Sequence, residues 1–542
     1  MATRTRSRAR KTQNDVVRIR RALISVSDKS GLDDLVPVLG RFGVEIVSTG
    51  ATASAIRQTG AEVREVSDLT GHPEIMDGRV KTLHPGVHGG LLADPGDSTH
   101  VRAMAEHGIE SVQLLVVNLY PFESTVAGDA GPESCIENID IGGPAMIRAA
   151  AKNHAHVCAI ADIDDYRKLI EEMELTGGGT RLAFRREMAE IAFSRTASYD
   201  AAVADWMASR TGVTTPRRTR TVAGHFVRTL RYGENPHQGA ALYSDGSGRP
   251  GPVSARQLQG KELSYNNYCD LDAGLGLISE FRPDIDGAAC VIIKHGNPCG
   301  VACRSTVLDA YLAALDCDPD SAFGGIVCFN ARLTKDVSKA ISSVFTEVVS
   351  APSIDRRAAK TLENRTNLRL LEVDPIPDHL RPRELMRPIV GGFLLQDSGG
   401  DSPGLDDVTT VSERHPSDDE VRDMLFAWRV VKHVTSNAVI YCRDRTTLGI
   451  GAGQMSRVDS ARIAGLKSRD RFSTGEGDGT GRGLVAASDA FLPFPDAISQ
   501  MTAAGVTALI QPGGSRGDSE VIQAANDAGI AMMFTGIRQF SH

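Results

Sequence analysis

Apolar runs alternate with amphipathic stretches through the first part of the chain. Short apolar runs that end in small or polar residues predict strands at residues 22–26, 44–48 and 114–119. Apolar positions at helical spacing predict helices at residues 32–42 and 52–59. Strands and helices that alternate in this way form a parallel sheet with helices on both faces. An α/β domain is therefore predicted over residues 22–212.

The remaining regions differ in composition. Residues 211–221, TGVTTPRRTRT, lack apolar periodicity and predict a linker at 213–221. A second domain that again mixes strands and helices is predicted over residues 222–542. Polar stretches rich in Pro and Gly at 375–419 and 472–483 are expected to be long loops.

The amino-terminal residues 1–21 are rich in Arg and poor in apolar side chains. This composition predicts a disordered basic tail. A transit peptide would also be rich in Arg, but it would form an amphipathic helix, and no such pattern is present.

Residues 291–300, VIIKHGNPCG, combine a buried strand with reactive side chains. The apolar residues predict a strand, expected to run parallel to its neighbours, that ends at Lys294 and His295 before a turn at 296–298. Ligands of open α/β sheets bind at the carboxyl ends of strands. A histidine there takes up a proton near neutral pH, and an adjacent ammonium stabilises developing negative charge. The alternative is a surface loop that happens to hold both side chains.

The same residues resemble a zinc-deaminase signature, in which His-x-Glu is followed by Pro-Cys-x-x-Cys. Here Asn297 replaces the Glu that serves as acid and base, and three residues separate Cys299 from Cys303. Ligand number and spacing both fail, so no metal site is predicted.

Several segments of the first domain suit a phosphorylated heterocycle. Residues 25–29 (SVSDK) and 48–52 (STGAT) follow predicted strands, where hydroxyl and backbone N–H groups bind phosphate or, alternatively, simply cap a helix. Residues 78–85 (GRVKTLHP) form a cationic loop. The groups that could move protons on the heterocycle are Lys81, Tyr120, Asp140 and Lys152.

The second domain adds further candidates. Arg231 beside Tyr232 suits a phosphate contact with a stacking surface, or packing at an interface. Residues 321–325 (SAFGG) bring backbone close to a ligand. Residues 449–457 are expected to follow a strand and open a helix, but they lack the G-x-G-x-x-G dinucleotide spacing. Residues 488–496 (SDAFLPFPD) suit a flat pterin-like ring or a hydrophobic lid.

Length, net charge and cysteine content limit the classes of protein to which the chain can belong. A chain of 542 residues is long enough for about two to four domains. Its net charge of −8 excludes general binding of nucleic acid. The nine cysteines, an odd number without a regular spacing, favour reduced and buried thiols in a cytosolic protein. No apolar run approaches the ~20 residues of a membrane span.

The motifs together resemble one family closely. The strings that carry the resemblance are, in order, SVSDK, GRVKTLHP, NLYPF, IDIGG, AAAKNH, LRYGENPHQ, KHGNP, SAFGG, GIGAGQ and SDAFLPF. They resemble the bifunctional purine-biosynthesis enzymes that join phosphoribosylaminoimidazolecarboxamide (AICAR) formyltransferase to inosine monophosphate (IMP) cyclohydrolase. The resemblance covers the chain from about residue 22 to its end.

This resemblance implies an activity. Formyl transfer from 10-formyltetrahydrofolate to AICAR gives formyl-AICAR (FAICAR), and dehydrative ring closure then gives IMP. It also implies a cytoplasmic homodimer with a transferase site shared between chains, and it leaves a monovalent-cation requirement open. A competing class is a non-catalytic nucleotide-binding regulator, but such a protein has no need of Lys294 beside His295.

For the first domain, the resemblance implies a methylglyoxal-synthase-like fold that carries the cyclohydrolase. Lys152 matches the family's proposed proton donor and acceptor, with Lys81, Tyr120 and Asp140 as its catalytic neighbours. The matched nucleotide-binding positions are Ser27, Asp28, Lys29, Thr49, Gly50, Ala51, Thr52, Arg79, Val80, Thr82, Val117, Asn118 and Ile141.

For the second domain, the resemblance implies a transferase of two cytidine-deaminase-like subdomains without zinc. His295 matches the proton acceptor and Lys294 the transition-state stabiliser. The matched nucleotide positions are Arg231, Tyr232, Gly324, Glu347, Asn437, Phe491 and Arg538. The matched folate positions are Arg457, Asp496, Ser515 and Arg516.

Three positions depart from the family pattern. Ala51 stands where the family usually has Gly, and it would be strained if that position required a positive φ. Glu347 lies near a family Asp, and Arg516 stands where a small residue is frequent.

Overall fold

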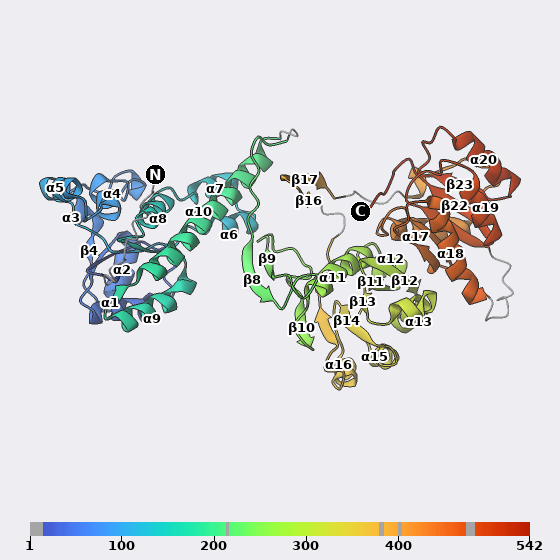
Figure 1. Cartoon of the computed structure of the whole chain (residues 1–542), viewed down its shortest axis with the longest axis horizontal. Helices are drawn as coiled ribbons and strands as arrows, with labels where there is room; N and C mark the ends of the chain where they lie inside the picture. Colours follow the sequence, from blue (N-terminus) through green and yellow to red (C-terminus); the bar gives the residue numbers. More distant parts are fainter. Residues whose placement is uncertain (1–14, 213–215, 379–383, 399–403, 473–482) are drawn as a thin grey trace, which may run out of the picture. The chain divides into compact units, whose positions relative to one another are not determined.

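The computed structural model describes residues 15–212, 216–378, 384–398, 404–472 and 483–542. The chain divides into two compact units, each with its own sheet and hydrophobic core (Figure 1). The first unit extends to His225 and includes residues 245–247. The second contains residues 226–244 and 248–542.

The first unit is built on a five-stranded parallel sheet with the order β4-β3-β2-β5-β6. Its strands are β2 (Arg21–Ile24), β3 (Glu45–Ser48), β4 (Arg64–Glu65), β5 (Leu114–Val116) and β6 (Cys158–Ile160). Leu23 packs in one hydrophobic cluster, and its neighbours Ala22 and Ile24 pack in another. Because successive side chains point to opposite faces, both faces of the sheet are covered.

The helices of this unit confirm the predicted alternation. They are α1 (Leu32–Arg41), α2 (Gly50–Gln58), α3 (Val66–Thr70), α4 (Pro85–Leu92), α5 (Ser98–Glu106), α6 (Phe122–Ala127), α7 (Pro132–Glu137), α8 (Gly142–Lys152), α9 (Tyr166–Thr176) and α10 (Leu182–Arg210), with 3-10 turns η1 (Met76–Gly78) and η2 (Ile163–Asp165). The long helix α10 packs on α8 and β6 and buries Tyr199 and Trp206. The strands and helices predicted for this region are confirmed to within three residues at each end.

The predicted basic tail is too long at its carboxyl end. Residues 1–14 lie outside the described part of the chain. After them, β1 (Val17–Arg18) pairs with β7 (Gly179–Thr180), and Ile19 is buried. Arg21 already belongs to β2 and forms an ion pair with Glu45 at 2.6 Å. The charge pattern suggested solvent exposure, whereas an acidic partner from another strand fixes this Arg to the sheet.

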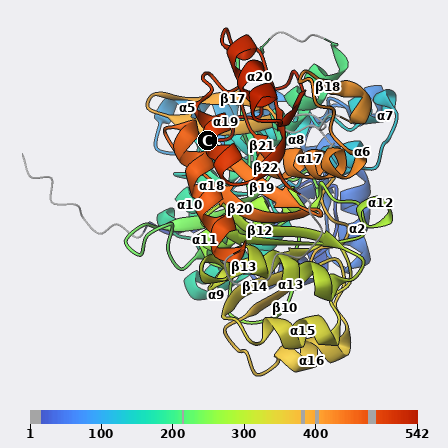
Figure 2. The same cartoon turned by 90° about the vertical axis from the view of Figure 1, so that its right-hand side faces the viewer.

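The second unit is built on a sheet of twelve strands. Their order is β10-β15-β14-β13-β11-β12-β20-β19-β21-β22-β23-β18, and Figure 2 shows part of this order, from β19 down to β10. The strands are β10 (Arg256–Gln259), β11 (Ala288–Lys294), β12 (Asn297–Arg304), β13 (Gly325–Phe329), β14 (Thr346–Ala351), β15 (Arg369–Glu372), β18 (Thr409–Thr410), β19 (Val439–Arg443), β20 (Thr446–Gly451), β21 (Leu484–Ser488), β22 (Val506–Gln511) and β23 (Ala531–Phe534). A separate hairpin joins β8 (His225–Leu230) to β9 (Ala240–Ser244).

The twelve-stranded sheet contains two halves with the same topology. Each half has a helix, an antiparallel hairpin, a second helix, a strand antiparallel to the first hairpin strand, and two strands parallel to that one. The first half consists of α11 (Tyr265–Ile278), β11, β12, α13 (Val307–Cys317), β13, β14 and β15. The second half consists of α17 (Asp418–Val431), β19, β20, α18 (Arg457–Phe472), β21, β22 and β23.

The two halves join into one sheet and one core. β12 pairs antiparallel with β20, where Ala302 lies opposite Thr446. A single cluster of buried residues includes Val291 from the first half and Ile440 from the second. The remaining helices are α12 (Pro283–Asp286), α14 (Pro319–Ala322), α15 (Lys335–Ile341), α16 (Arg356–Leu362), α19 (Asp496–Ala503), α20 (Asp518–Asp527) and the 3-10 turn η3 (Leu405–Asp407). Among the described residues, no helix has the length and apolar character needed to cross a bilayer.

The strand that ends at Lys294 is not parallel to its neighbours. β11 is antiparallel to both β12 and β13, because the chain reverses directly after it and no crossover helix follows. The predicted turn is also displaced. It consists of His295 and Gly296, with φ angles of 52° and 73°, whereas Asn297 and Pro298 already belong to β12. Positive φ at both positions is typical of a two-residue type I′ hairpin turn.

The first predicted long loop contains regular structure. Between residues 375 and 419, β16 (Glu384–Ile389) pairs with β17 (Gly392–Asp397), and β18 joins the large sheet. Flanking Pro and Gly residues obscured the short apolar runs of this hairpin. The second predicted loop, at 472–483, lies almost entirely outside the described residues.

Two glycines mark the packing of a helix on each hairpin. Gly449 and Gly451 lie within β20, not in a turn that opens a helix as expected, and α18 begins only at Arg457. A Cβ atom on Gly449 would lie 2.1 Å from the carbonyl oxygen of Ala464 in α18. In the first half, a Cβ on Gly300 would lie 1.8 Å from the carbonyl oxygen of Ala314 in α13. Glycine therefore permits close helix–strand contact in both halves.

Candidate functional site

In the first unit, the predicted phosphate-binding turns lie side by side. β3, β2 and β5 are adjacent and parallel, so the residues that follow them meet at one edge of the sheet. Ser25 Oγ lies 3.2 Å from Thr49 Oγ1. Thr52 Oγ1 donates a hydrogen bond to the Val26 carbonyl oxygen at 2.9 Å. These hydroxyl groups tie the first two turns together.

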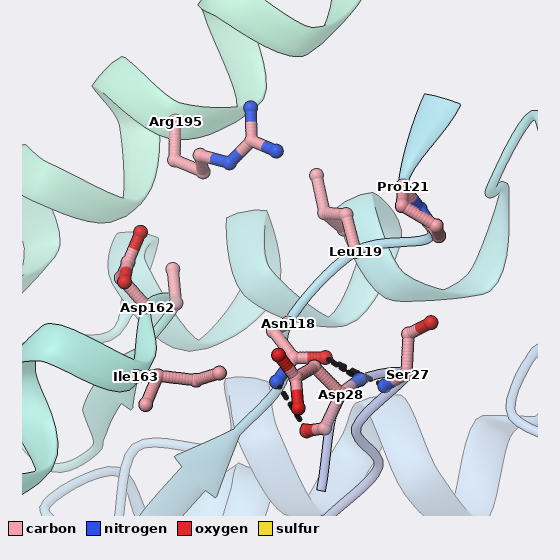
Figure 3. A pocket seen from close by; sticks show the side chains of 9 residues that line it. Ser27, Asp28, Asn118, Leu119, Pro121, Asp162, Ile163 and Arg195 are labelled. Carbon is pink, nitrogen blue, oxygen red and sulfur yellow. Dashed lines mark hydrogen bonds between the residues drawn. The ribbon is translucent and has the colours of Figure 1, made fainter. Parts of the chain in front are cut away.

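Asn118 ties the third turn to the first. Its Oδ1 accepts hydrogen bonds from the backbone N–H groups of Ser27 at 2.6 Å and Asp28 at 3.0 Å, and its Nδ2 donates to the Asp28 carbonyl oxygen at 2.8 Å (Figure 3). These residues line a pocket of about 380 Å³, and Arg195 of α10 lies across the pocket from them. The size suits part of a nucleotide-sized ligand.

Two ammonium groups lie near the start of α2. Lys29 Nζ donates to the carbonyl oxygen of Ser27 at 2.7 Å. Burial lowers the pKa of Lys29, the Asp28 carboxylate raises it, and the nearby charge of Lys81 lowers it again. Lys81 also approaches Gly50, because a Cβ on that glycine would lie 3.5 Å from its Nζ. Paired cations beside a helix amino terminus favour an anion.

The departure at Ala51 does not strain this turn. The positive φ, 41°, belongs to Gly50, the first residue of α2. Ala51 is the second residue of that helix and is absent from the described non-glycine residues with positive φ. The strain considered from the sequence therefore does not arise.

Asp140 provides a half-buried carboxyl group before α8. Its Oδ1 accepts a hydrogen bond from the Gly143 N–H at 2.8 Å, and its own backbone N–H donates to the Tyr199 hydroxyl at 2.8 Å. Burial raises the pKa of Asp140, and the N–H groups of Gly143 and Tyr120 offset part of the rise. A carboxyl group shifted in this direction is suited to exchange protons with a substrate.

The other cyclohydrolase candidates differ in burial. Thr82 is buried close to Gly142 at the start of α8, and Val117 is buried after β5. Arg79 pairs with the exposed Glu137 at 2.6 Å. The exposed or partly exposed side chains are Tyr120, Ile141, Val80 and Lys152.

Lys152 is separated along α8 from the other proton-transfer candidates. Asp140 precedes the helix and Lys152 ends it, so the helix axis places them about 15 Å apart. Among the described contacts, none joins Lys152 to Lys81, Tyr120 or Asp140.

In the second unit, the directions of the strands bring the sheet-borne transferase candidates to one edge. β11, β20, β21, β22 and β23 run one way, whereas β13, β14 and β19 run the other way. The candidates follow strands of the first group or lie at the beginnings of strands of the second. They are Lys294, His295, Gly324, Glu347, Asn437, Arg457, Phe491, Asp496, Ser515, Arg516 and Arg538.

This edge is wide. Four strand-to-strand steps separate β11 from β21, which corresponds to about 19 Å. Lys294 and Glu347 therefore belong to one part of the edge, and Phe491 and Arg538 belong to another.

Lys294 and His295 occupy the hairpin end in the first half. The Lys294 ammonium donates to the carbonyl oxygen of Phe323 and would lie 3.0 Å from a Cβ on Gly324. Glycine at position 324 therefore leaves room for this cation. Both hairpin residues line a pocket of about 300 Å³, which Asp318 also lines. A cation and an imidazole thus face one cavity.

Arg231 and Tyr232 lie near an ion pair between Glu347 of β14 and Arg369 of β15. The guanidinium of Arg231 stacks 5.6 Å from the centre of the Tyr232 ring. Glu347 accepts a hydrogen bond from Asn267 at 2.9 Å and lies 3.5 Å from the guanidinium of Arg369. Burial lowers the pKa of Arg369, which Glu347 raises and Arg231 lowers further. Two guanidinium groups with one acidic partner leave local positive charge for an anion.

Asn437 belongs to a buried polar cluster of the second half. Its Oδ1 accepts a hydrogen bond from Arg457 at 2.6 Å. Arg457 also bonds with Asp489 and donates to Ser488 Oγ at 2.9 Å. Arg457 is 8% exposed and Asp489 is fully buried. The guanidinium is thus engaged with protein groups and holds Asn437 in place.

The remaining transferase candidates are more accessible. Phe491 is 37% exposed, and Asp496 is the exposed first residue of α19. Ser515 Oγ accepts a hydrogen bond from the Gly517 N–H at 3.1 Å, next to the exposed Arg516. The Arg538 guanidinium stacks 4.5 Å from the Phe540 ring centre. These side chains form the outer part of the edge.

The cysteines of the degenerate zinc signature are buried in β12. Burial raises the pKa values of Cys299 and Cys303 to about 12. Among the described residues, no three His, Cys, Asp or Glu side chains come together as a metal site. All nine cysteines are unpaired, and all except Cys269 are buried, as the composition predicted.

Several residues of these sites were missed from the sequence. They are Arg195 and Asp162 in the first unit, and Asn267, Asp270, Asp318, Arg369, Lys467 and Asp489 in the second. Most of them lie outside the motifs that resemble the family, on elements distant in sequence from those motifs. Local sequence patterns therefore did not indicate them. Asp489 lies inside SDAFLPF, and its complete burial distinguishes it from the exposed Asp496.

Comparison with known families gives two matches. Residues 31–145 match the family model described as MGS-like domain, and residues 150–467 match the one described as AICARFT/IMPCHase bienzyme. Together they agree with the expected α/β fold class of both parts.

Curated relatives match over nearly the whole chain. A protein of Dinoroseobacter shibae named bifunctional purine biosynthesis protein PurH is 56% identical over 97% of this chain and 100% of its own length. A protein of Ruegeria pomeroyi with the same name is 53% identical, with the same coverage of each chain. Among solved structures, one titled crystal structure of ForH has 37% identity and a TM-score of 0.31, covering 35% of this chain and 99% of that one.

Proposed function

The chain belongs to the AICARFT/IMPCHase family of bifunctional purine-biosynthesis enzymes, and from this premise we propose how its residues divide the two reactions. The enzyme transfers a formyl group to AICAR and closes the product FAICAR to IMP. We assign transfer to the edge of the twelve-stranded sheet and ring closure to the edge of the five-stranded sheet.

The observation that supports the assignment of transfer is that Lys294 and His295 line the same cavity. The AICAR amine is a weak nucleophile, because its lone pair is delocalised into the ring. As its nitrogen attacks the formyl carbon, the His295 imidazole accepts the amine proton, and the folate nitrogen leaves with the electron pair of the broken bond. Lys294 stabilises the charge on the formyl oxygen.

For nucleotide binding, we assign the phosphate to Arg231 with Arg369 nearby. Arg538 adds a second cation, and Phe491 supplies a ring surface. Gly324 leaves room at this edge for the Lys294 ammonium, since a Cβ there would lie 3.0 Å from its Nζ.

The cosubstrate of transfer is 10-formyltetrahydrofolate. We place its contacts at Asp496, Ser515 and Arg516, which are accessible at the outer edge. Arg457 acts indirectly in this proposal, because its guanidinium is bonded to Asn437 and Asp489. No zinc is assigned, and the cytoplasm is the proposed location.

For ring closure, we assign Asp140 as the proton acceptor. The carboxamide nitrogen of FAICAR attacks the formyl carbon, and the oxygen of the resulting carbinol leaves as water. Asp140 takes the proton from the attacking nitrogen, while Lys81 stabilises the oxygen as it gains charge and then protonates it to the carbinol. Asp140 returns its proton to the carbinol hydroxyl, which leaves as water, and the former formamide nitrogen gives its remaining proton to Lys81 as the C=N bond forms. Lys29 and the start of α2 hold the phosphate. Lys152, which no described contact joins to these groups, is left as a prediction from the sequence and the family resemblance.

We further propose a homodimer in which each transferase site takes residues from both chains. The separation of about 19 Å between β11 and β21 supports this arrangement, because one small nucleotide does not reach from one to the other. A mixture of His295→Ala and Arg538→Ala proteins that exchange subunits should regain up to about one quarter of parental transfer. Absence of recovery despite verified exchange would show that each site lies within one chain.

The assignment of transfer is tested with His295→Ala. The variant should lose about 10²-fold or more in transfer kcat and retain cyclisation. Asp444→Ala is the matched control, because Asp444 occupies the corresponding left-handed position, φ 50°, in the second half. Both half-reactions are measured on one preparation. Near-parental transfer by folded His295→Ala would remove His295 as the base, and equal loss of both reactions would indicate a structural role.

A further inference from the structure

The two halves of the large sheet share a contact between a helix and a hairpin turn. In the second half, Asp423 of α17 accepts hydrogen bonds from the backbone N–H groups of Asp444 at 2.8 Å and Arg445 at 2.7 Å. In the first half, Asp270 of α11 accepts a hydrogen bond from the Gly296 N–H at 2.7 Å. Each aspartate is the sixth residue of its helix. The contact therefore belongs to the duplicated fold.

Both turns have the same strained conformation. The φ angles are 52° and 73° at His295 and Gly296, and 50° and 51° at Asp444 and Arg445. Residues other than glycine are disfavoured in the left-handed region. A carboxylate that accepts one N–H group of the turn in the first half, and two in the second half, stabilises this conformation.

The two turns differ in the side chains they present. Lys294 and His295 in the first half correspond to Arg443 and Asp444 in the second, at the same places in the hairpin. The second turn thus reproduces the backbone without an imidazole. Stabilisation of the turn alone accounts for Asp423, whereas in the first half the same contact also fixes the residue that carries the proposed base.

We propose that Asp270 is a positioning residue for His295. The inference rests on the proposed function, in which His295 accepts the amine proton. The carboxylate of Asp270 anchors the Gly296 N–H, and the imidazole extends from the adjacent residue. Among the described hydrogen bonds, Asp270 makes one bond to its turn where Asp423 makes two. Among the described residues, loss of Asp270 therefore removes the one side-chain hydrogen bond to the backbone of the His295–Gly296 turn.

The expected effect is on turnover and not on binding. Misplacement of a reacting group by about 1 Å costs up to about 10²-fold in rate. Asp270→Ala should lower the transfer kcat by about 10- to 100-fold, with KM values within about threefold and cyclisation unchanged. Asp270→Asn should restore kcat to within about threefold of the parent, because its amide oxygen still accepts the Gly296 N–H.

The control is Asp423→Ala, measured in the full-length protein beside the two Asp270 variants and His295→Ala. It removes two hydrogen bonds from the corresponding turn, so it should lower the thermal midpoint at least as much as Asp270→Ala. Its transfer kcat should stay within about twofold of the parent, because that turn carries no reacting group.

The outcomes decide whether Asp270 positions His295 or only stabilises the fold. Equal losses of kcat in Asp270→Ala and Asp423→Ala would reduce the contact to general stabilisation and overturn the proposal. A loss in Asp270→Asn as large as in His295→Ala would also overturn it, since the charge and not the anchor would then matter. If Asp270→Ala does not fold, Asp270→Asn alone decides by this second criterion. Unimpaired transfer in His295→Ala would instead refute the proposed function on which the inference rests.

Discussion

At the scale of single residues, the sites combine groups that the sequence shows with partners that it hides. The strings around Lys294, His295 and Asp140 pointed to these residues because polar side chains follow apolar runs there. Asp270 and Arg369 have no such signal. They reach the sites from a helix and from a strand distant in sequence, so only the folded chain reveals them.

The pKa of Asp140 gives a prediction for cyclisation. Burial raises this pKa, so the carboxylate form required of a proton acceptor is lost at a higher pH than for a free aspartate. The cyclisation rate should therefore fall toward acid through an apparent pKa above the ordinary value of about 3.9. Asp140→Asn should lower the rate by about 10²-fold and abolish this acid limb.

The measurement is the pH dependence of FAICAR closure, with formyl transfer assayed on the same samples as a control for folding. An acid limb that is unchanged in Asp140→Asn would assign it to another group, and parental activity would exclude Asp140 as the base.

Lys81 gives a second prediction at this scale. Lys81→Met removes a charge beside the start of α2 and should weaken FAICAR binding and turnover by about 10-fold each. The exposed cation Arg41 of α1 is the comparison, since Arg41→Met changes the net charge equally but is not among the candidate nucleotide-binding residues. Equal effects of both substitutions on cyclisation would indicate a general field and not a specific contact.

At the scale of elements, the hydrophobic pattern was informative where strands are buried on both faces. It gave the alternating strands and helices of the first unit, because each apolar run there is short and bounded. It did not give the direction of β11. A buried apolar run is compatible with either direction, and the His295–Gly296 turn is a weaker hairpin signal than Asn-Gly. The β16–β17 hairpin was hidden for a similar reason, since Pro and Gly surround it.

The close packing of α13 on β12 predicts a large effect of a single methyl group. Gly300→Ala would place a Cβ 1.8 Å from the Ala314 carbonyl oxygen, which is fixed backbone. The helix or the strand must move, and the free energy of unfolding of the second unit should fall by about 1–3 kcal/mol or more.

Gly392→Ala in β17 is the matched control, because its added Cβ would meet no atom within 4 Å. Urea unfolding of the full-length variants, followed by tryptophan fluorescence, compares the two changes. A loss in Gly300→Ala no larger than in Gly392→Ala would contradict the packing argument.

At the scale of the whole molecule, a buried cluster of ion pairs links the two halves of the large sheet. Glu280, which follows α11, lies 2.9 Å from both Lys432 and His433, which follow α17. The Glu280 carboxylate is 1% exposed. Asp286 pairs with Arg429 of α17 at 2.8 Å beside it. The cluster thus joins the first helix of one half to the first helix of the other.

This cluster predicts the acid stability of the second unit. Burial alone would raise the pKa of Glu280, but His433 and Lys432 lower it from 4.5 to about 2. A depressed carboxyl pKa stabilises the folded state above pH 4.5, and this contribution is lost as the pH falls toward 2. The loss should be on the order of 3 kcal/mol.

Unfolding free energies between pH 7 and pH 2 test this prediction. Glu280→Gln should be destabilised at pH 7 and should show a weaker decline toward acid than the parent. A parallel decline in both proteins would assign the acid sensitivity to other carboxylates, such as Glu420, whose pKa, despite burial, is lowered to about 2 by Arg414.

The duplicated hairpin also has a consequence for the history of the chain. Two halves with the same topology, the same aspartate-anchored turn and the same glycine contact under a helix are most simply explained by duplication of one ancestral gene segment. Once fused, only one copy of the turn needed to retain a reactive histidine. The second copy of the turn was released to diverge in side chains while its left-handed backbone persisted, and the recognition residues of that half lie at the opposite edge, where β19 begins. Duplication thereby separated the evolution of chemistry from the evolution of specificity within a single sheet.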